Sequence, residues 1–390
     1  MKYAAEKIDI KAIRKRLEND IRLLREPNLG YVRAGFPRFS ALFGRDSCIV
    51  SWQLIDYDST IAQKTIEILA RFQGEKINNL SEEEPGKILH EWHPNPKEYK
   101  PLSWPLPYYG SVDSTPLFIF LCGLYYRKTQ DKQWLKRYWP HIKSALKWCE
   151  EYGDLDGDML LEYIRKNPEG LMHQGWKDSR LDHLGLKPPI EIVEVQGYYF
   201  LALCVALDFA QLMEDKELAI ALDERRKKLK ENFIAEFWVP EKSFFAIALS
   251  ESKFPDTRIS SNPGHLLFTG ILDGEKEKIR AVVNRLFQKD MWTAYGIRTH
   301  AESNPDFDPA SYHLGSIWPH DNWIIAQGLK KYGYEREYQM IKEALLDAYR
   351  QLGEIPELYA VVNNKIEKIP RACSPQAWAS GALLNFILEK

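Results

Sequence analysis

The chain has 390 residues, so it either holds two or three domains or belongs to a large single-domain class such as a helical or α/β barrel. Its 53 Lys and Arg residues nearly balance its 55 Asp and Glu residues, which gives no support for a nucleic-acid or membrane partner. The five cysteines lack C-x-x-C spacing, and no apolar run has the length of a signal peptide or membrane span. We therefore expect a cytoplasmic protein without a disulfide framework.

Apolar residues recur at helical spacing along the whole chain, whereas strand-like alternation is nearly absent. Helix starts are recognisable at Ser59 or Thr60 and at Asp131. The pattern predicts helices over 8–24, 47–56, 59–73, 113–128, 131–151, 192–213, 215–236, 275–288, 316–331, 334–350 and 375–388.

Several of these helices form consecutive pairs with short connectors, as in helical hairpins. Longer connectors rich in Trp, His, Pro and Gly separate the pairs, and connectors of this kind are usually functional. About six pairs predict an all-α protein with an (α/α)6 barrel, in which the long connectors form one rim. No flexible linker occurs, so residues 1–390 are predicted to form one domain, with residues 1–40 supplying an N-terminal helix that packs on the barrel.

The segment FGRDSCIVSWQL, residues 43–54, is the first candidate site. Arg45 offers a planar donor fork and Asp46 an anionic acceptor, which together suit two neighbouring hydroxyl groups. The alternative is that Asp46 caps the following helix and that Arg45 points to solvent.

Aromatic and histidine side chains gather between residues 90 and 116. The HEWHP sequence hints at a metal, but Pro and Trp break the helix and a third ligand is not evident, so no metal is predicted. Trp92, Trp104, Tyr108 and Tyr109 fit either a stacking wall for a ligand or ordinary packing. Asp113 either caps the next helix or presents its carboxylate to the rim.

The segment GDLDGDMLLEY places Asp154, Asp156 and Asp158 at alternate positions around a glycine. The spacing resembles the start of a calcium loop, but the sixth-position Gly and twelfth-position Glu of an EF-hand are missing. A turn after a helix explains the segment without a metal, and calcium binding is left open.

Two further segments, GLMHQGWKDSRLDH at 170–183 and IPELYAVVNNKIEKIPRACSPQAW at 355–378, each place a candidate acid in a non-helical connector. These acids are Asp178 and Glu357. Hydrolysis of a glycosidic bond needs one carboxyl group that protonates the leaving oxygen and one that activates water. Taken singly, each acid is more often an ordinary hydrogen-bonding residue of a loop.

The chain resembles the C-terminal glucosidase domain of glycogen debranching enzymes, the amylo-α-1,6-glucosidase type, which is related to glucoamylases and trehalases. The matching motifs run in order from about residue 40 to the C-terminus. They are FGRDS at 43–47, YYGSVDSTPLFI at 108–119, QGWKDS at 174–179, EVQGYY at 194–199, SNPGHLLFTGI at 261–271, GIRTHA at 296–301, SYHLGSIWPHDN at 311–322, PELY at 356–359 and ACSPQAWASGALL at 372–384.

The resemblance implies an (α/α)6 barrel and an inverting, exo-acting hydrolase of α-linked glucosides that needs no cofactor. It makes Asp178 the general acid and Glu357 the general base, with Arg45 and Asp46 holding the terminal sugar. Residues in matching motifs are expected to line the same pocket, namely Trp176, Lys177, Gln196, Tyr198, His313, Trp318, His320 and Gln376.

Departures from the family pattern leave the substrate open. Arg180, Leu181, Asp182 and His183 replace the usual small polar run after GWKDS. A small glucoside is expected rather than a branched polymer, and a trehalase or a glucosylglycerate-type hydrolase is the alternative. A toroid epimerase or phosphorylase and a sugar-binding homologue are the further alternatives. The oligomeric state is not predicted.

Overall fold

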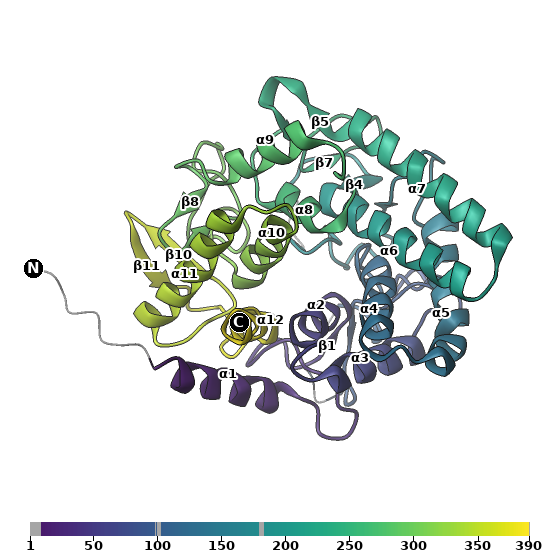
Figure 1. Cartoon of the computed structure of the whole chain (residues 1–390), viewed down its shortest axis with the longest axis horizontal. Helices are drawn as coiled ribbons and strands as arrows, with labels where there is room; N and C mark the ends of the chain where they lie inside the picture. The colour runs from purple at the N-terminus through teal and green to yellow at the C-terminus, as the bar shows by residue number, and fades with distance from the viewer. Residues whose placement is uncertain (1–8, 98, 100–102, 179–182, 390) are drawn as a thin grey trace, which may run out of the picture.

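The computed structural model describes residues 9–97, 99, 103–178 and 183–389, and its helices form two concentric rings (Figure 1). In the inner ring each helix contacts the next, from α2 through α4, α6, α8, α10 and α12 back to α2. This closed ring confirms the predicted (α/α)6 barrel. The inner helices are α2 (Gly44–Leu54), α4 (Ser114–Thr129), α6 (Val193–Leu212), α8 (Leu266–Thr269), α10 (Pro319–Lys331) and α12 (Ala377–Leu388).

Each outer helix packs against the inner ring, with α1 on α12, α3 on α2, α5 on α4, α7 on α6 and α11 on α10. The predicted hairpins are therefore present, and α9 contacts the short 3-10 helix η2 (Asn262–His265) that precedes α8. The outer helices are α1 (Ile10–Leu24), α3 (Ser59–Arg71), α5 (Lys132–Glu151), α7 (Lys216–Phe237), α9 (Lys276–Leu286) and α11 (Glu335–Leu352).

The distribution of apolar residues explains which helix lies in which ring. Helix α1 buries only Ile13, Leu17, Ile21 and Leu24, one stripe at helical spacing, as expected for an outer helix. Helix α6 is apolar on nearly all sides and lies mostly buried in the inner ring. It is the one described helix long and apolar enough to cross a membrane, and its burial is that of a core helix.

The α8 element was not predicted as a helix, because η2 and α8 together span only residues 262–269. Pro263 lies in the first turn of η2, and Gly270, with φ of +88°, ends α8 in the left-handed region that glycine favours. A segment this short gives no helical periodicity in the sequence. The N-cap of α3 is also one residue earlier than expected, since Asp58 accepts from the Thr60 amide at 3.0 Å.

Short antiparallel strand pairs tie the long connectors together at the rim. Strand β1 (Leu42–Phe43) pairs with β2 (Glu91–Trp92), and β4 (Ile190–Ile192) lies between β3 (Glu162–Tyr163) and β7 (Ala248–Leu249). The remaining pairs are β5 (Trp238–Val239) with β6 (Phe244–Phe245), β8 (Trp292–Thr293) with β9 (Gly296–Ile297), and β10 (Tyr359–Val362) with β11 (Lys365–Lys368).

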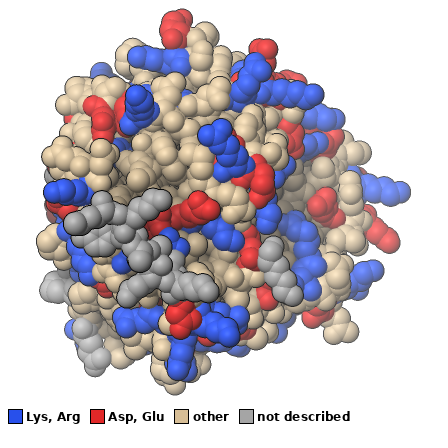
Figure 2. Space-filling model, turned by 60° about the vertical axis from the view of Figure 1, so that its left-hand side comes forward, with Lys and Arg blue, Asp and Glu red and all other residues tan. Residues whose placement is uncertain are grey.

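Basic and acidic side chains are interspersed over the face drawn in Figure 2, as expected from the near-zero net charge of −2. No extended field of one sign covers the described part of this face. Recognition of a ligand therefore depends on local groups.

Candidate active site

One cavity lies where the inner helices α2, α10 and α12 begin, since Phe43, Trp318 and Gln376 are the N-cap residues of these helices. It brings together side chains from both ends of the chain, among them the two acids predicted to be catalytic. The lining residues are Phe39, Phe43, Arg45, Asp46, Trp176, Asp178, Tyr312, Trp318, Glu357, Gln376 and Trp378.

Arg45 is buried at 2% exposure and joins two acids. Its Nε donates to Asp113 Oδ2 at 2.6 Å, and its Nη1 donates to Asp178 Oδ2 at 3.0 Å. A third donor, Nη2, reaches the Gln174 carbonyl at 3.4 Å. Arg45 thus does not point to solvent, and Asp113 serves as its ion-pair partner rather than as a helix cap.

The start of α2 is fixed by a close backbone approach. The Gly44 amide donates to the His90 carbonyl at 3.0 Å, and a Cβ at Gly44 would lie 2.1 Å from the Leu89 carbonyl oxygen. Only glycine fits there. This contact places Arg45 and Asp46 in the first turn of α2, beside the connector that carries His90.

Asp46 is buried in the first turn of α2, and the N-cap residue of this helix is Phe43 rather than Asp46. Burial raises the pKa of Asp46 to about 8 against the attraction of Arg45, with the charges of Asp178 and Glu357 adding to the rise. At neutral pH the carboxyl group of the free protein is therefore mostly protonated, so it can both donate to and accept from a hydroxyl group.

Asp178 lies at the end of a loop held down by its own polar residues. The Val112 amide donates to the Gln174 carbonyl at 3.0 Å, and Gln174 Nε2 donates to Glu82 Oε2 at 2.6 Å. The side chain of Asp178 is 26% exposed, and His90 Nε2 is 4.0 Å from its Oδ2. The residues that follow it, Ser179 to Asp182, lie outside the described part of the chain.

Glu357 is buried at 1% exposure between two donors. The Tyr312 hydroxyl donates to its Oε1 at 2.5 Å, and the Cys373 amide donates to its Oε2 at 3.0 Å. Burial raises the pKa of Glu357, while Tyr312, Cys373, Arg38 and Gln376 oppose that rise. A carboxylate held by fixed donors in a cavity can accept a proton from water.

Three tryptophans form the apolar part of the cavity. Trp176 lies edge-on to Trp318 with ring centroids 5.7 Å apart, and Trp318 lies edge-on to Trp378 at 5.9 Å. Such faces pack against the C–H surfaces of a ligand ring. Gln376 accepts from the Ala377 amide at 2.7 Å and so holds the start of α12 beside Glu357.

The two predicted histidines lie behind the tryptophans. His313 stacks on Trp318 at 5.2 Å, and His320 stacks on Trp378 at 3.7 Å. Burial holds both pKa values well below 6.5, so both rings are neutral at pH 7. Neither ring lines the cavity that holds the acids, although His313 lines an adjoining one.

The other predicted pocket residues make structural contacts behind the cavity. Lys177 Nζ donates to the Thr299 carbonyl at 2.6 Å, and burial lowers the pKa of Lys177 to about 8. Gln196 exchanges hydrogen bonds with the Leu161 backbone at 2.7 Å. The Tyr198 hydroxyl is 2.6 Å from His265 Nδ1. The structure does not place these three among the residues that line the cavity.

Sequence reasoning missed several cavity residues, namely Phe39, Phe43, Tyr312 and Trp378. Each of these residues lies in or beside one of the family motifs FGRDS, SYHLGSIWPHDN and ACSPQAW. Their position near these motifs could have identified them as lining residues. The expected stacking wall is ordinary packing: Trp104 stacks on Tyr108 at 4.6 Å, and Trp92 packs on Phe72. The side chains of His90 and His93 do not point to a common site. His93 stacks on Tyr99, whereas His90 lies near Asp178.

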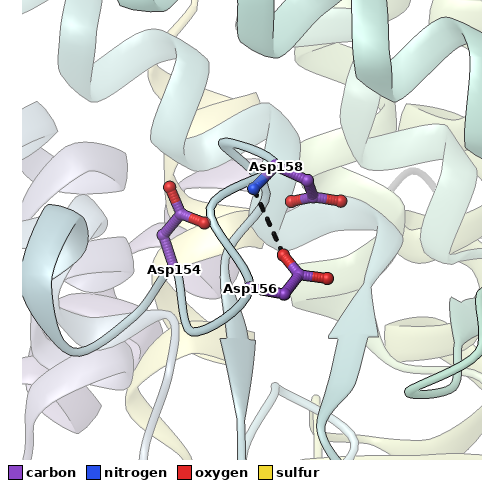
Figure 3. A group of neighbouring side chains, drawn as sticks. All are labelled: Asp154, Asp156 and Asp158. Carbon is purple, nitrogen blue, oxygen red and sulfur yellow. Dashed lines mark hydrogen bonds between the residues drawn. The ribbon is translucent and has the colours of Figure 1, made fainter.

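The side chains of Asp154, Asp156 and Asp158 lie around one tight loop, and the Asp158 amide donates to Asp156 at 3.2 Å (Figure 3). The three carboxylates are close enough to hold a cation. The three carboxylates are paired with basic side chains of the protein itself. Lys253 Nζ lies 2.9 Å from Asp156 and 2.5 Å from Asp158 and also pairs with the buried Glu191, while Arg225 pairs with Asp154 at 2.8 Å.

Replacing Lys253 with Met is expected to lower the free energy of unfolding by about 3 kcal/mol, because Glu191 would lose its cationic partner while buried. Denaturant unfolding measures this loss, and Lys242→Met, on an exposed Lys, is the control. Wild-type Tm should not respond to EDTA or to millimolar Ca²⁺. A rise with Ca²⁺ would show that the loop binds the ion in place of Lys253.

Residues 42–365 match the family model described as "Mannosylglycerate hydrolase MGH1-like glycoside hydrolase domain". A mannosylglycerate hydrolase, MGH1, of Selaginella moellendorffii is 34% identical over 95 residues, which is 24% of this chain. The aligned segment spans only 18% of that relative.

Solved structures agree over nearly the whole chain. The mannosylglycerate hydrolase of Thermus thermophilus in complex with Tris and D-glycerate has a TM-score of 0.72 at 13% identity, covering 96% of this chain and 99% of that one. The same enzyme in complex with glucose has a TM-score of 0.71 at 15% identity, covering 96% of this chain and 99% of that one. These relatives are mannosylglycerate hydrolases and not debranching glucosidases.

Proposed function

Because the chain belongs to the mannosylglycerate hydrolase MGH1-like glycoside hydrolase family, we propose that it is an inverting hydrolase of small α-glycosides. Its substrate would be a terminal α-linked hexose joined to glycerate or a similar small acid. The observation that carries the proposal is that Asp178 and Glu357, two carboxyl groups from distant connectors, line one cavity with three tryptophans.

Asp178 would act as the general acid. A proton on Asp178 passes to the glycosidic oxygen as the bond to the anomeric carbon breaks. Arg45 holds this carboxyl group, but it shares its charge with Asp113, which is fully buried. Two carboxyl groups thus share one cation at this position.

Glu357 would act as the general base. A water molecule between Glu357 and the anomeric carbon gives up its proton to the carboxylate and attacks from the side opposite the leaving oxygen, which inverts the anomeric configuration. Tyr312 and the Cys373 amide fix the two oxygens of Glu357, so the base is already oriented before substrate binds.

Arg45 and Asp46 would hold the hydroxyl groups of the terminal sugar. Protonated Asp46 can donate one hydrogen bond and accept another, and Arg45 donates only, so the pair suits adjacent hydroxyls. Mannose and glucose differ at one hydroxyl, and the glucoside predicted from the sequence is retained as the second candidate because the same residues would serve it.

A substrate panel tests the proposal. We expect hydrolysis of α-mannosylglycerate or α-glucosylglycerate, with maltose, isomaltose and trehalose cleaved far more slowly. NMR at early times should find the β-anomer of the released hexose, because inversion converts an α-glycoside to a β-hemiacetal. Release of the α-anomer first would rule out the inverting mechanism.

The pH profile tests the role of Glu357. Since burial raises its pKa above 4.5 and the base works ionised, kcat/KM should fall on the acid side at a pH above 4.5. Tyr312→Phe removes a donor that favours the carboxylate, so the pKa rises and the acid limb should move to higher pH by about one unit. The exposed Tyr57→Phe serves as the control, and an unmoved limb in Tyr312→Phe would contradict the assignment.

A further inference from the structure

The carboxyl group of Glu82 is buried at 1% exposure against the loop that leads to Asp178. Its oxygens accept from a hydroxyl, a backbone amide and a side-chain amide. Oε1 accepts from the Tyr108 hydroxyl at 3.1 Å and from the Asn167 amide at 3.4 Å. Oε2 accepts from Gln174 Nε2 at 2.6 Å. A buried carboxyl group with fixed donors is costly to displace, so Glu82 is a rigid point in this part of the molecule.

The segment that carries Glu82, residues 78–84, is itself held in one conformation. The backbones of Asn78 and Glu83 exchange hydrogen bonds at 2.9 and 3.0 Å, and Lys87 Nζ donates to the Glu82 carbonyl at 3.2 Å. Glu82 has φ of +56°, in the left-handed region that residues other than glycine rarely adopt. Residues kept in that region are common where a site depends on their placement. Here the turn directs the Glu82 side chain inward, onto the loop.

The acid loop, defined as residues 167–178, is tied to Glu82 at several positions. Besides the two direct donors, the Leu171 amide donates to the Tyr108 hydroxyl at 3.0 Å. Tyr108 gives its own proton to Glu82, so the contact with Leu171 also depends on the carboxyl group. The loop is therefore restrained at intervals before it reaches Asp178.

Gln174 carries this restraint to Asp178. Its side chain is held by Glu82, while its carbonyl accepts from the Val112 amide at 3.0 Å and from Arg45 Nη2 at 3.4 Å. The same guanidinium group donates to Asp178 Oδ2 at 3.0 Å. A shift of the Gln174 backbone would therefore move the carboxyl group of Asp178 within the cavity. Misplacement of a reacting group by about 1 Å can cost about 100-fold in rate.

We propose that Glu82 is a positioning residue for the general acid, and that it sets the place of Asp178 through its hydrogen bond to Gln174. This inference rests on the proposed function, in which Asp178 protonates the leaving oxygen. Glu82 is not among the described residues that line the cavity, so its effect reaches the reaction through the acid loop. Its loss should impair protonation of the leaving oxygen and spare the attack by water.

The test compares two leaving groups that differ in their need for the acid. Gln174→Met and Glu82→Met are assayed on the α-glycoside of the panel that is hydrolysed fastest and on the 2,4-dinitrophenyl α-glycoside of the same sugar. We expect kcat on the first substrate to fall roughly 10- to 100-fold in each variant, and kcat on the second to change about threefold or less. Gln174→Met keeps Glu82 and its bond to Tyr108, so it decides the question if Glu82→Met does not fold.

Matched variants show whether the hydrogen bond itself is responsible. Glu82→Gln keeps an amide that can bond to Gln174 and Tyr108, so it should regain most of the kcat that Glu82→Met loses. The double variant Glu82→Met/Gln174→Met should be no slower than the slower single variant, because both changes break the same bond. Glu83→Gln is the control, since Glu83 accepts from the exposed Glu75 amide at 3.1 Å, and it should change neither rate. Equal losses on the two substrates, or no loss on the first, would overturn the inference.

Asp178→Asn, measured alongside, separates this inference from the hydrolase proposal. If Asp178→Asn recovers on the activated substrate while Gln174→Met is unimpaired or slow on both, the general acid stands and the positioning role is wrong. If Asp178→Asn is equally slow on both substrates, or no glycoside is hydrolysed, the acid assignment and the positioning role fall together. Hydrogen exchange in peptides from residues 167–178 should be faster in both Met variants, and unchanged exchange there would contradict the restraint whatever the activity.

Discussion

Replacing Asp178 with Asn or Glu357 with Gln is expected to lower kcat by about 10²- to 10⁴-fold while leaving the protein folded, because each change removes proton transfer and keeps the shape of the side chain. Circular dichroism and Tm check the fold. Glu367→Gln, on the exposed strand β11, removes an acid from the hairpin that follows Glu357 and should retain full activity.

A substrate with an activated leaving group separates the two roles. Departure of 2,4-dinitrophenolate from an α-mannoside needs little protonation, so Asp178→Asn should recover much of its rate on that substrate. Glu357→Gln should remain slow on both substrates, since attack by water still needs a base. Recovery in Glu357→Gln, or an equal deficit in both variants, would show that the roles are assigned wrongly.

Replacing Arg45 with Met is expected to lower the free energy of unfolding by about 3–5 kcal/mol, because the fully buried Asp113 would lose its cationic partner. Urea unfolding followed by tryptophan fluorescence measures the loss. The second change Asp113→Asn should restore part of the stability, since it removes the unpaired charge.

The matched control for Arg45 is Arg350→Met, because Arg350 pairs with Asp347 at an exposed position of α11. Exposed pairs contribute about 1 kcal/mol or less, so Tm should hardly change. If Arg45→Met and Arg350→Met lose the same stability, Arg45 is not a structural cation for Asp113, and its contact with Asp178 would be its main role.

The hairpins of the barrel could be predicted because their helices are long and carry clear caps, as at Asp131, which accepts from the Gln133 and Trp134 amides. The fourth inner helix could not be predicted, since α8 is one turn of helix that gains its stability from buried packing rather than from its own sequence. Periodicity identifies helices in which apolar residues recur over several turns, and the four residues of α8 are too few to show such a repeat.

The proposed catalytic acids could be singled out because their motifs resemble a known family, and local sequence alone left each of them an ordinary loop residue. The lining residues were predicted less well. Gln196 and Tyr198 belong to the family motif EVQGYY and were therefore expected to line the pocket. Helix α6 instead directs their side chains toward Leu161 and His265, away from the cavity. Distance along the chain does not report which way a helix faces.

The contact between α12 and α2 bears on how the molecule folds. Gln53 Nε2 donates to the Trp378 carbonyl at 3.0 Å, across 325 positions of sequence. The cavity that holds Asp178 and Glu357 also contains Arg45 from one end of that interval and Gln376 from the other, so it cannot form while the ring is open. Closure of so long a loop is slow, and a nascent chain would hold the apolar flanks of α2 and α10 uncovered until α12 emerged. Catalytic competence and completion of the fold should therefore appear together, in a single late step.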